Sequence, residues 1–389
     1  MLRKPAIGMT TARTLCCLIS IFAATTAFSS VLGSRRSLYL ENLRKRNGSR
    51  STLSISALEQ QPSDDRRPSV NQVQSSPRRI ARVEKFARLP VWPVWNGVFI
   101  FAVSRLLGEE VAAKLEDNIG GRVCPNFFQE ADRTSPFIML VHHRHSFAAW
   151  DILRFIQRSF FPEGFPSHPH RGFVTVTYIL KGGFRHRDSL GIKQLYGAEE
   201  KYNGKHTQWL TTGGGILHEE MFDMSYKNIF QPCDQELYQL WLNLPSQEKL
   251  APPNIDLLGG EDETPCVKVT DSEGRSTETI VIAGRHGTKS SSAPIRSDLA
   301  ILHVQMEPGT VWRHSLPSSH ETVVLYMRRG SVDVQGTRVP PHYTAYFGPL
   351  GSDLTVMAQD GGADFLLLAG QRRSSQGILR FARQGVLSP

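Results

Sequence analysis

The sequence predicts an all-β protein built from two β-barrels in tandem. Short runs rich in β-branched and aromatic residues recur between glycines and prolines over most of the chain, a pattern typical of sandwiches and barrels. The segment PSQEKLAPPNIDLLGGEDETP divides these runs into two halves of similar size. A length of 389 residues is sufficient for two ordinary domains with additional segments.

The N-terminal region has the composition of a targeting sequence. Residues 1–27 contain an apolar core preceded by basic residues and are predicted to be a signal peptide. Residues 28–88 are rich in Ser and Arg and end in a Gln, Ser, Pro and Arg stretch, which predicts a transit-peptide-like disordered linker. This bipartite arrangement favours the plastid of an alga with complex plastids, and secretion is the alternative.

The charge of the chain is concentrated in this leader. The formal net charge is +9, but residues 1–88 hold 16 Lys and Arg against 5 Asp and Glu, so the remainder is close to neutral. The folded part therefore lacks the basic surface that nucleic-acid binding requires, and no nucleic-acid partner is expected.

The first barrel is predicted over residues 89–250. Its first apolar run, LPVWPVWNGVFIFAVSRLLG, is interrupted by Pro93 and is too short for a transmembrane anchor, so it is interpreted as a packing segment. The apolar residues of FAAWDILRFIQRSFF recur at helical spacing, which predicts a short amphipathic helix over 148–160. Strands such as GFVTVTYIL, TQWLTT and LYQLWLNL follow.

The second barrel is predicted over residues 271–370, after a linker at 251–270. Its expected strands include LAILHVQM, ETVVLYMRRGSVDVQG and FLLLAG. Residues 371–389 form a short tail. His303, His314 and His320 lack paired spacing, so no metal site is expected in this half.

Two short motifs of the first barrel predict a metal site. In a strand, residues i and i+2 point to one face, so His168 and His170 of HPHRGF project together. His218 and Glu220 of GGGILHEEM have the same spacing. Three imidazoles and a carboxylate suit iron, manganese, nickel, copper or zinc. Four protein ligands leave coordination positions open in an octahedral site, which is what a catalytic metal needs.

For several other residues, a structural role competes with a role at the metal or substrate. His186 and Asp188 either orient a ligating imidazole or lie in a surface turn. Trp209 and Trp241 are expected in the core rather than at a substrate. A solvated loop is favoured for a histidine-rich segment that has no carboxylate at ligand spacing. This segment comprises His142, His143 and His145.

The motifs HPHRGF with TVTY, QWLTTGGGILHEEM and QLWLNLP resemble the pirin family over residues 108–370. The resemblance implies two tandem cupin (jelly-roll) barrels, with one non-haem iron in the N-terminal barrel. It assigns the iron ligands to the residues already selected by strand parity: His168, His170, His218 and Glu220. Some pirins resemble quercetin 2,3-dioxygenases, and one animal branch acts as a nuclear transcriptional co-regulator.

The sequence departs from the family pattern at several positions. The glutamate of the usual HPHRGFET falls on Val174, which leaves Glu220 as the only motif carboxylate that can take a proton. An arginine is missing at Gly214, and the C-terminal tail is unlike that of the family.

The resemblance favours an oxygenase. One divalent metal, with Fe(II) preferred and Mn, Ni, Cu or Zn also open, would bind a flavonol or catechol-like phenol and O₂, with Glu220 as the catalytic base. One alternative is a non-enzymatic metal or redox sensor that acts on a protein partner. The other is a bicupin whose metal only stiffens the fold.

Overall fold

The computed structural model describes residues 76–86, 88–89, 94–128, 131–159, 162–224 and 230–372. The chain divides into two compact units, residues 1–73 with 156–161 and residues 74–155 with 162–389. Both barrels belong to the second unit, which is the one described below. The predicted signal peptide, most of the predicted linker 28–88 and nearly all of the tail 371–389 lie outside the described residues.

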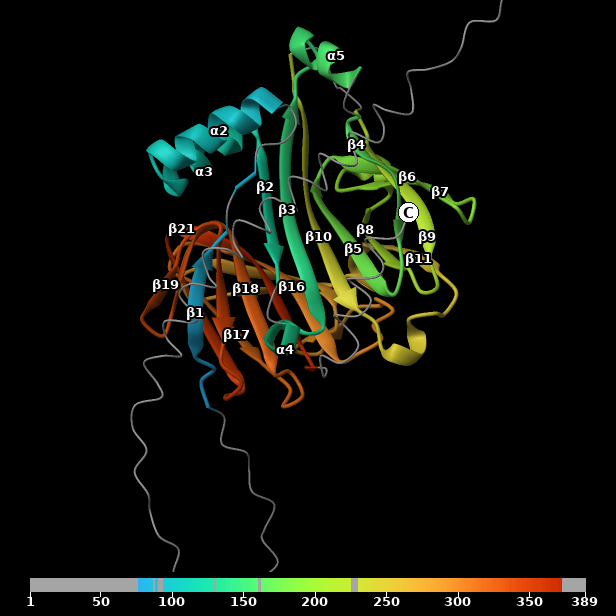
Figure 1. Ribbon diagram of the computed structural model, residues 1–389. Coiled ribbons are helices and arrows are strands. Elements are labelled where there is room, and N and C mark those ends of the chain that lie inside the picture. The colour runs from blue at the N-terminus through green and yellow to red at the C-terminus, as the bar shows by residue number, and fades with distance from the viewer. Residues whose placement is uncertain are drawn as a thin grey trace, which may run out of the picture. The chain divides into compact units, whose positions relative to one another are not determined.

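Apart from β1, which joins the second barrel, the elements of the first barrel and its helices precede those of the second barrel (Figure 1). In chain order they are β1 (Ile80–Lys85), α2 (Val94–Leu106), α3 (Glu109–Ile119), β2 (Arg122–Phe127), α4 (Ala131–Thr134), β3 (Phe137–Phe147), α5 (Ile152–Arg158), β4 (Gly164–His170), β5 (Phe173–Lys181), β6 (Gly183–Asp188), β7 (Lys193–Gly197), η1 (Glu200–Tyr202), β8 (Lys205–Thr211), β9 (Ile216–Phe222), β10 (Cys233–Asn243), η2 (Ser246–Glu248) and β11 (Asn254–Gly259). The remaining elements are α6 (Gly260–Glu263), β12 (Cys266–Thr270), β13 (Ser276–Ala283), β14 (Arg285–His286), β15 (Lys289–Ser290), β16 (Leu299–Met306), β17 (Val311–Ser315), β18 (Thr322–Val334), β19 (Thr337–Val339), β20 (Tyr343–Phe347) and β21 (Asp353–Gly370).

The first barrel consists of two antiparallel sheets. The larger has the order β11-β8-β5-β10-β3-β2, and the smaller has the order β4-β9-β6-β7. The long strands β3 and β10 pair side by side along the middle of the molecule (Figure 1). The predicted metal-ligand motifs therefore lie on two neighbouring strands of the small sheet, β4 and β9.

The second barrel is formed by one continuous set of strands in the order β1-β20-β18-β21-β16-β13-β12, with β17 on β21 and β19 on β18. Strand β21 pairs through its first part with β17 and through its last part with β16, so it continues from one side of the barrel to the other.

Two segments expected to be linkers form strands. Residues 80–85, within the predicted linker 28–88, form β1 and pair with β20 of the second barrel. The predicted linker 251–270 contains β11, which extends the large sheet of the first barrel, and β12, which extends the second. In both cases the segment is polar and contains proline, so its sequence did not indicate a strand. The strands that form lie at the edges of sheets, where a strand pairs with a neighbour along one edge only.

The barrels pack against each other through the outer face of the large sheet. Alternation along β10 directs Tyr238 and Leu240 into a shared apolar core with Tyr326 and Leu366 of the second barrel. The adjacent Leu367 instead lies in the interior core of the second barrel. Both faces of β21 are therefore buried, which explains why FLLLAG is apolar without alternation.

The structure confirms a packing role for the first apolar run and shortens the predicted helix. The packing segment contains α2, whose buried Ile100 and Val103 pack with Ala112 of α3. The helix predicted over 148–160 is shorter and spans Ile152–Arg158. Its apolar side chains are exposed, and the buried one is Arg154, which forms an ion pair with Glu163.

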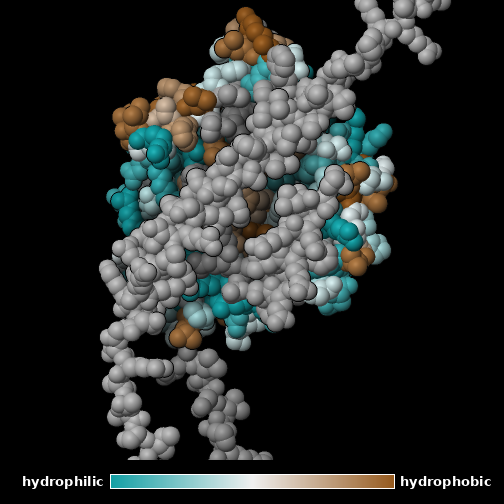
Figure 2. All heavy atoms as spheres, in the orientation of Figure 1, coloured by the Kyte–Doolittle hydropathy of each residue, from teal (hydrophilic) through white to brown (hydrophobic). Residues whose placement is uncertain are grey.

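Exposed apolar side chains on α2 include Val98, Phe99 and Leu106, and Figure 2 shows apolar colouring over this helix. Within the described residues, no helix combines the length and hydropathy that crossing a membrane requires.

Candidate metal centre

Strand register brings the two predicted motifs together. Strands β4 and β9 pair antiparallel with His168 opposite His218, after a bulge that follows Phe165. Strand β6 pairs with the other edge of β9 and places His186 opposite Glu220. The i, i+2 spacing within β4 and β9 directs the side chains of both motifs towards the barrel interior.

Three imidazoles converge on one point. The Nε2 atom of His168 lies 3.0 Å from that of His170 and 3.1 Å from that of His218. Two nitrogens that each lie about 2.1 Å from a shared ion at a right angle are separated by about 3.0 Å, so the spacing fits a single first-row metal. These three histidines form a cluster of metal-ligand type within the described residues.

The tautomer of His168 supports this interpretation. Its Nδ1 atom lies 2.7 Å from the backbone carbonyl oxygen of Pro166, which can only accept a hydrogen bond. Nδ1 therefore carries the proton, and the Nε2 lone pair faces the other two rings. A metal-bound imidazole is usually held by this kind of contact.

Glu220 belongs to an overlapping cluster with His218 and His186. Its Oε1 atom accepts hydrogen bonds from the Tyr196 hydroxyl at 2.8 Å and from the Thr177 hydroxyl at 3.2 Å. Its Oε2 atom accepts one from Gln239 at 3.3 Å. The four predicted ligands thus fall into two overlapping clusters that share His218, and not into one close group. The second cluster adds His186 to the metal centre.

His186 is buried, so its interpretation as part of a surface turn is wrong. Its Nε2 atom lies 2.8 Å from Asp188, and its Nδ1 atom is buried without a hydrogen-bond partner in the described part of the chain. The Nδ1 atom of His218 also has no partner among the described residues, but it carries the proton when Nε2 faces a metal. Buried, unpaired ring nitrogens beside a carboxylate are suited to a cation.

Burial keeps the two inner imidazoles neutral. It lowers the pKa of His170 to about 2 and that of His218 to about 3, with the nearby His168 adding to both effects. Neutral imidazole is the form that binds metals, so in both rings the ligating form predominates at neutral pH.

One side of the metal centre is more open to solvent than the others. His168 is partly exposed, and the neighbouring Leu217 is 51% exposed. On the inner side, Trp241 lies 5.3 Å from His170 and 4.6 Å from Phe173, measured between ring centroids. The Trp241 Nε1 atom is buried and has no hydrogen-bond partner within the described residues.

Two family models match the chain. The model named Pirin matches residues 118–242, and the model of the Pirin C-terminal cupin domain matches residues 301–375. Pirin-1 of Arabidopsis thaliana is 31% identical over 278 residues, which is 69% of this chain and 84% of that protein. The chain belongs to the Pirin family. A divalent metal is typical of this family, and the His and Glu cluster fits one.

Other pirins and one solved structure are similar to the chain. Pirin of Homo sapiens is 33% identical over 218 residues, which is 54% of this chain and 67% of that protein. A Pseudomonas aeruginosa protein named "Putative quercetin 2,3-dioxygenase" is 37% identical over 165 residues, which is 42% of this chain and 54% of that protein. The crystal structure of a quercetin 2,3-dioxygenase from Acinetobacter baumannii has a TM-score of 0.58 at 22% identity and covers 80% of this chain and 97% of that chain. The predicted all-β bicupin fold is confirmed.

The structure clarifies the departures from the pirin pattern. Val174, at the position of the family glutamate, faces the core between the barrels and not the imidazole cluster. A carboxylate there would not reach the metal centre from this backbone. A side chain at Gly214 would meet the backbone oxygen of Leu250 at 3.3 Å, so the missing arginine is not excluded by severe crowding.

The histidine-rich segment is not a solvated loop. It forms part of β3, and its three histidines are buried. His143 contacts Phe165 in the interior of the first barrel, whereas His142 contacts Tyr326 of the second barrel. Packing of two barrels against this strand buries both of its faces, which no local pattern could indicate.

Trp209 is in the core as expected. Trp241 is partly buried, packs against an apolar cluster of the first barrel and also contacts His170 of the metal centre. In the second barrel, His286 and His314 approach each other with their Nδ1 atoms 3.0 Å apart. His303 bonds Asp364, and His320 bonds Asp298.

The sequence interpretation missed the residues that hold Glu220. These are Thr177 on β5, Tyr196 on β7 and Gln239 on β10. Thr177 and Gln239 lie in the motifs TVTY and QLWLNLP, but their inward direction depends on the register of the large sheet.

Proposed function

We propose that the chain is a metal-dependent dioxygenase that acts on flavonol or catechol-like phenols with O₂. The observation that carries the proposal is the convergence of three imidazole nitrogens next to a buried carboxylate, with an open side at His168. The name of the Pseudomonas aeruginosa relative supports the same reaction. Fe(II) is the preferred metal, and Mn, Ni, Cu and Zn are alternatives.

His168, His170 and His218 would hold the metal, together with Glu220 or His186. The metal would supply Lewis acidity and redox chemistry. Glu220 would take the proton of a substrate hydroxyl, because it forms a cluster with His218 and His186, and three hydrogen bonds orient it. The indole face of Trp241 and the ring of Phe173 would bind the aromatic ring of the substrate beside His170.

Metal analysis and oxygen uptake test this proposal. The full chain is expected to contain one equivalent of metal and to consume O₂ when a flavonol or catechol is added. In Glu220→Gln we expect loss of turnover with the metal retained, because the amide cannot accept the proton. Full activity of this variant would exclude Glu220 as the base.

Metal without oxygen uptake across a panel of phenols would contradict the enzyme and favour a metal or redox sensor. That second candidate rests on analogy with the animal branch of the family, from which Pirin of Homo sapiens is a relative. The sensor predicts that a protein partner binds the oxidised and reduced forms with different affinities, which a pull-down under controlled redox conditions measures.

We propose plastid import for the N-terminal segment, with secretion as the alternative. A fluorescent protein fused to residues 1–75 should enter the plastid of an alga with complex plastids. Accumulation in the medium would support secretion, and retention in the cytosol would contradict both.

A further inference from the structure

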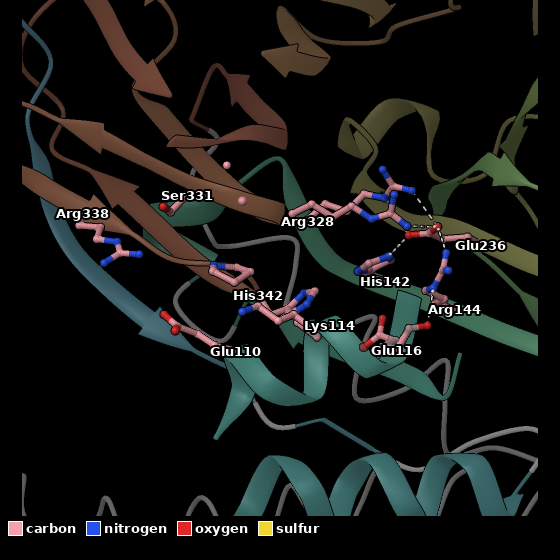
Figure 3. A pocket seen from close by; sticks show the side chains of 15 residues that line it. Glu110, Lys114, Glu116, His142, Arg144, Glu236, Arg328, Ser331, Arg338 and His342 are labelled. Carbon is pink, nitrogen blue, oxygen red and sulfur yellow. Dashed lines mark hydrogen bonds and ion pairs between the residues drawn. The ribbon is translucent and has the colours of Figure 1, made fainter. Parts of the chain in front are cut away.

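A cavity lies away from the metal centre, between α3, the large sheet of the first barrel and strand β18 of the second (Figure 3). Its volume is about 310 Å³, which is within the range of small-molecule sites. Strands β3 and β10 contribute to it with the faces opposite to those that line the barrel interior.

The floor of the cavity is a closed ion cluster. Arg328 donates two hydrogen bonds to Glu236, each 2.7 Å long, and Arg144 donates a third of 2.6 Å. His142 contacts the same carboxylate at 2.9 Å, and Arg328 also pairs with Asp364. The two guanidinium groups and two carboxylates balance one another, so the floor is rigid and close to neutral.

The mouth of the cavity is cationic. Lys114 and Arg338 are exposed, line the cavity and form no ion pair with any described residue. Arg329 lies at the edge of the floor, 3.9 Å from Glu236. Of the lining carboxylates outside the floor, Glu116 is neutralised by Arg88 and Arg122. The other such carboxylate is Glu110. Its single negative charge does not balance Lys114 and Arg338, so the mouth has an excess of positive charge.

The backbone is shaped to bring these groups together. Strand β18 has irregular register between Met327 and Arg329 and again between Gly330 and Val332. Neighbouring residues of a regular strand point to opposite faces, but the irregularities allow Arg328 and Arg329 to line the same cavity.

His342 also lines the cavity and has a φ of 65°, a left-handed conformation that is uncommon outside glycine. Such conformations are strained and tend to occur at binding sites.

We propose that this cavity binds a small organic dianion, with its acidic groups against the cations of the mouth. Guanidinium groups match carboxylate and phosphate oxygens in geometry as well as charge. A dicarboxylate and a phosphate ester share this chemistry. The proposal does not depend on the reaction at the metal centre, which lies on the other face of β10.

Calorimetric titration of the metal-loaded full chain with succinate and with glycerol 2-phosphate tests the proposal, with glycerol as the neutral probe. We expect binding of at least one anion, weaker at high ionic strength, and none of glycerol. Tighter binding of one anion shows whether the site takes a dicarboxylate or a phosphate ester. The same titration of metal-free protein should give the same affinity, which excludes binding at the metal.

The variant K114Q/R338Q should bind the anion about ten-fold more weakly, since two cations leave the mouth. The matched control K193Q/R313Q removes the same charge at exposed positions outside the cavity. It should bind as the unmodified chain does. R338K keeps the charge and should retain most of the affinity.

Equal melting temperatures of the unmodified chain and both double variants would show that all are folded. Absence of binding to either anion would overturn the proposal. Equal weakening in the cavity variant and the control would also overturn it, because the effect would then come from net charge alone.

Discussion

The two barrels have related architectures but fill their interiors in different ways. Among the described residues, the interior core of the second barrel contains 22 buried apolar residues, and two clusters in the first contain six and three. The first interior also contains the histidines of the metal centre and the polar residues that hold Glu220. A barrel that houses a polar site gives up apolar burial, which is the main stabilising term in folding.

The first barrel compensates by burying apolar side chains on its outer face, against the second barrel. The core between the barrels also contains 22 buried residues and covers the outer face of the large sheet. The second barrel therefore acts as a support on which a less apolar barrel is held. Four predictions test this division of roles, in order of decreasing effect.

The largest effect is expected from removal of a ligand. His170→Ala should lower metal affinity by more than about 100-fold, because loss of a supporting partner alone costs about 10–100-fold. Metal content and oxygen uptake measure the effect. His286→Gln, in the second barrel, should retain both. Equal metal loss in the two variants would mean that the histidines of the second barrel also contribute to binding.

Leucine truncations compare the two interiors. Leu302→Ala, in the second barrel, should lower the free energy of unfolding by about 2–5 kcal/mol and leave the metal content of the folded protein unchanged. Leu237→Ala, in the first barrel, should lower both stability and metal affinity, because it opens a cavity in the interior that holds the centre. Denaturant titrations and metal analysis distinguish these outcomes. Metal loss in Leu302→Ala alone would reverse the assignment of roles.

A smaller effect should appear in the pH dependence of stability. Burial, with His286 and His320 nearby, lowers the pKa of His314 from 6.5 to about 3. Between these values the unfolded chain binds a proton that the folded chain does not, so stability falls as pH decreases from 6.5. Above 6.5 there is no contribution.

His314→Gln should remove up to about 1.4 kcal/mol per pH unit from the slope of stability against pH in the acid range. Denaturant titrations of the unmodified and variant chains over that range measure the slope. An unchanged slope would show that His314 titrates normally in the folded state.

The smallest change in stability is expected for Trp241→Phe. The variant keeps an aromatic ring beside His170 and removes a buried Nε1–H that has no partner among the described residues. Stability should change by less than about 1 kcal/mol, and metal should be retained. If Nε1 binds substrate, KM for the phenol should rise by about ten-fold, which is consistent with one lost hydrogen bond. An unchanged KM would exclude a hydrogen bond from Nε1 to the substrate.

The sequence predicted the fold class and the strands of the metal centre because both depend on local periodicity. His168 with His170, and His218 with Glu220, share a face wherever their strands lie. The entry of His186 and the exclusion of Val174 depend on which sheet faces which, and this is decided by pairing between distant strands. The same applies to His142 and His143, whose opposite surroundings follow from the docking of the second barrel on β3.

Strand β1 has a consequence for how the chain is made. Ile80 leaves the ribosome before any residue of the first barrel, but its partner Phe347 is synthesised only after nearly all of the second. Until Phe347 is synthesised, β1 has no strand to pair with. In any chain that lacks residues 80–85, the edge of β20 has no partner strand. An exposed edge of this kind can pair with another copy of itself. A chain shortened past Lys85 should therefore aggregate, even though both barrels remain otherwise intact.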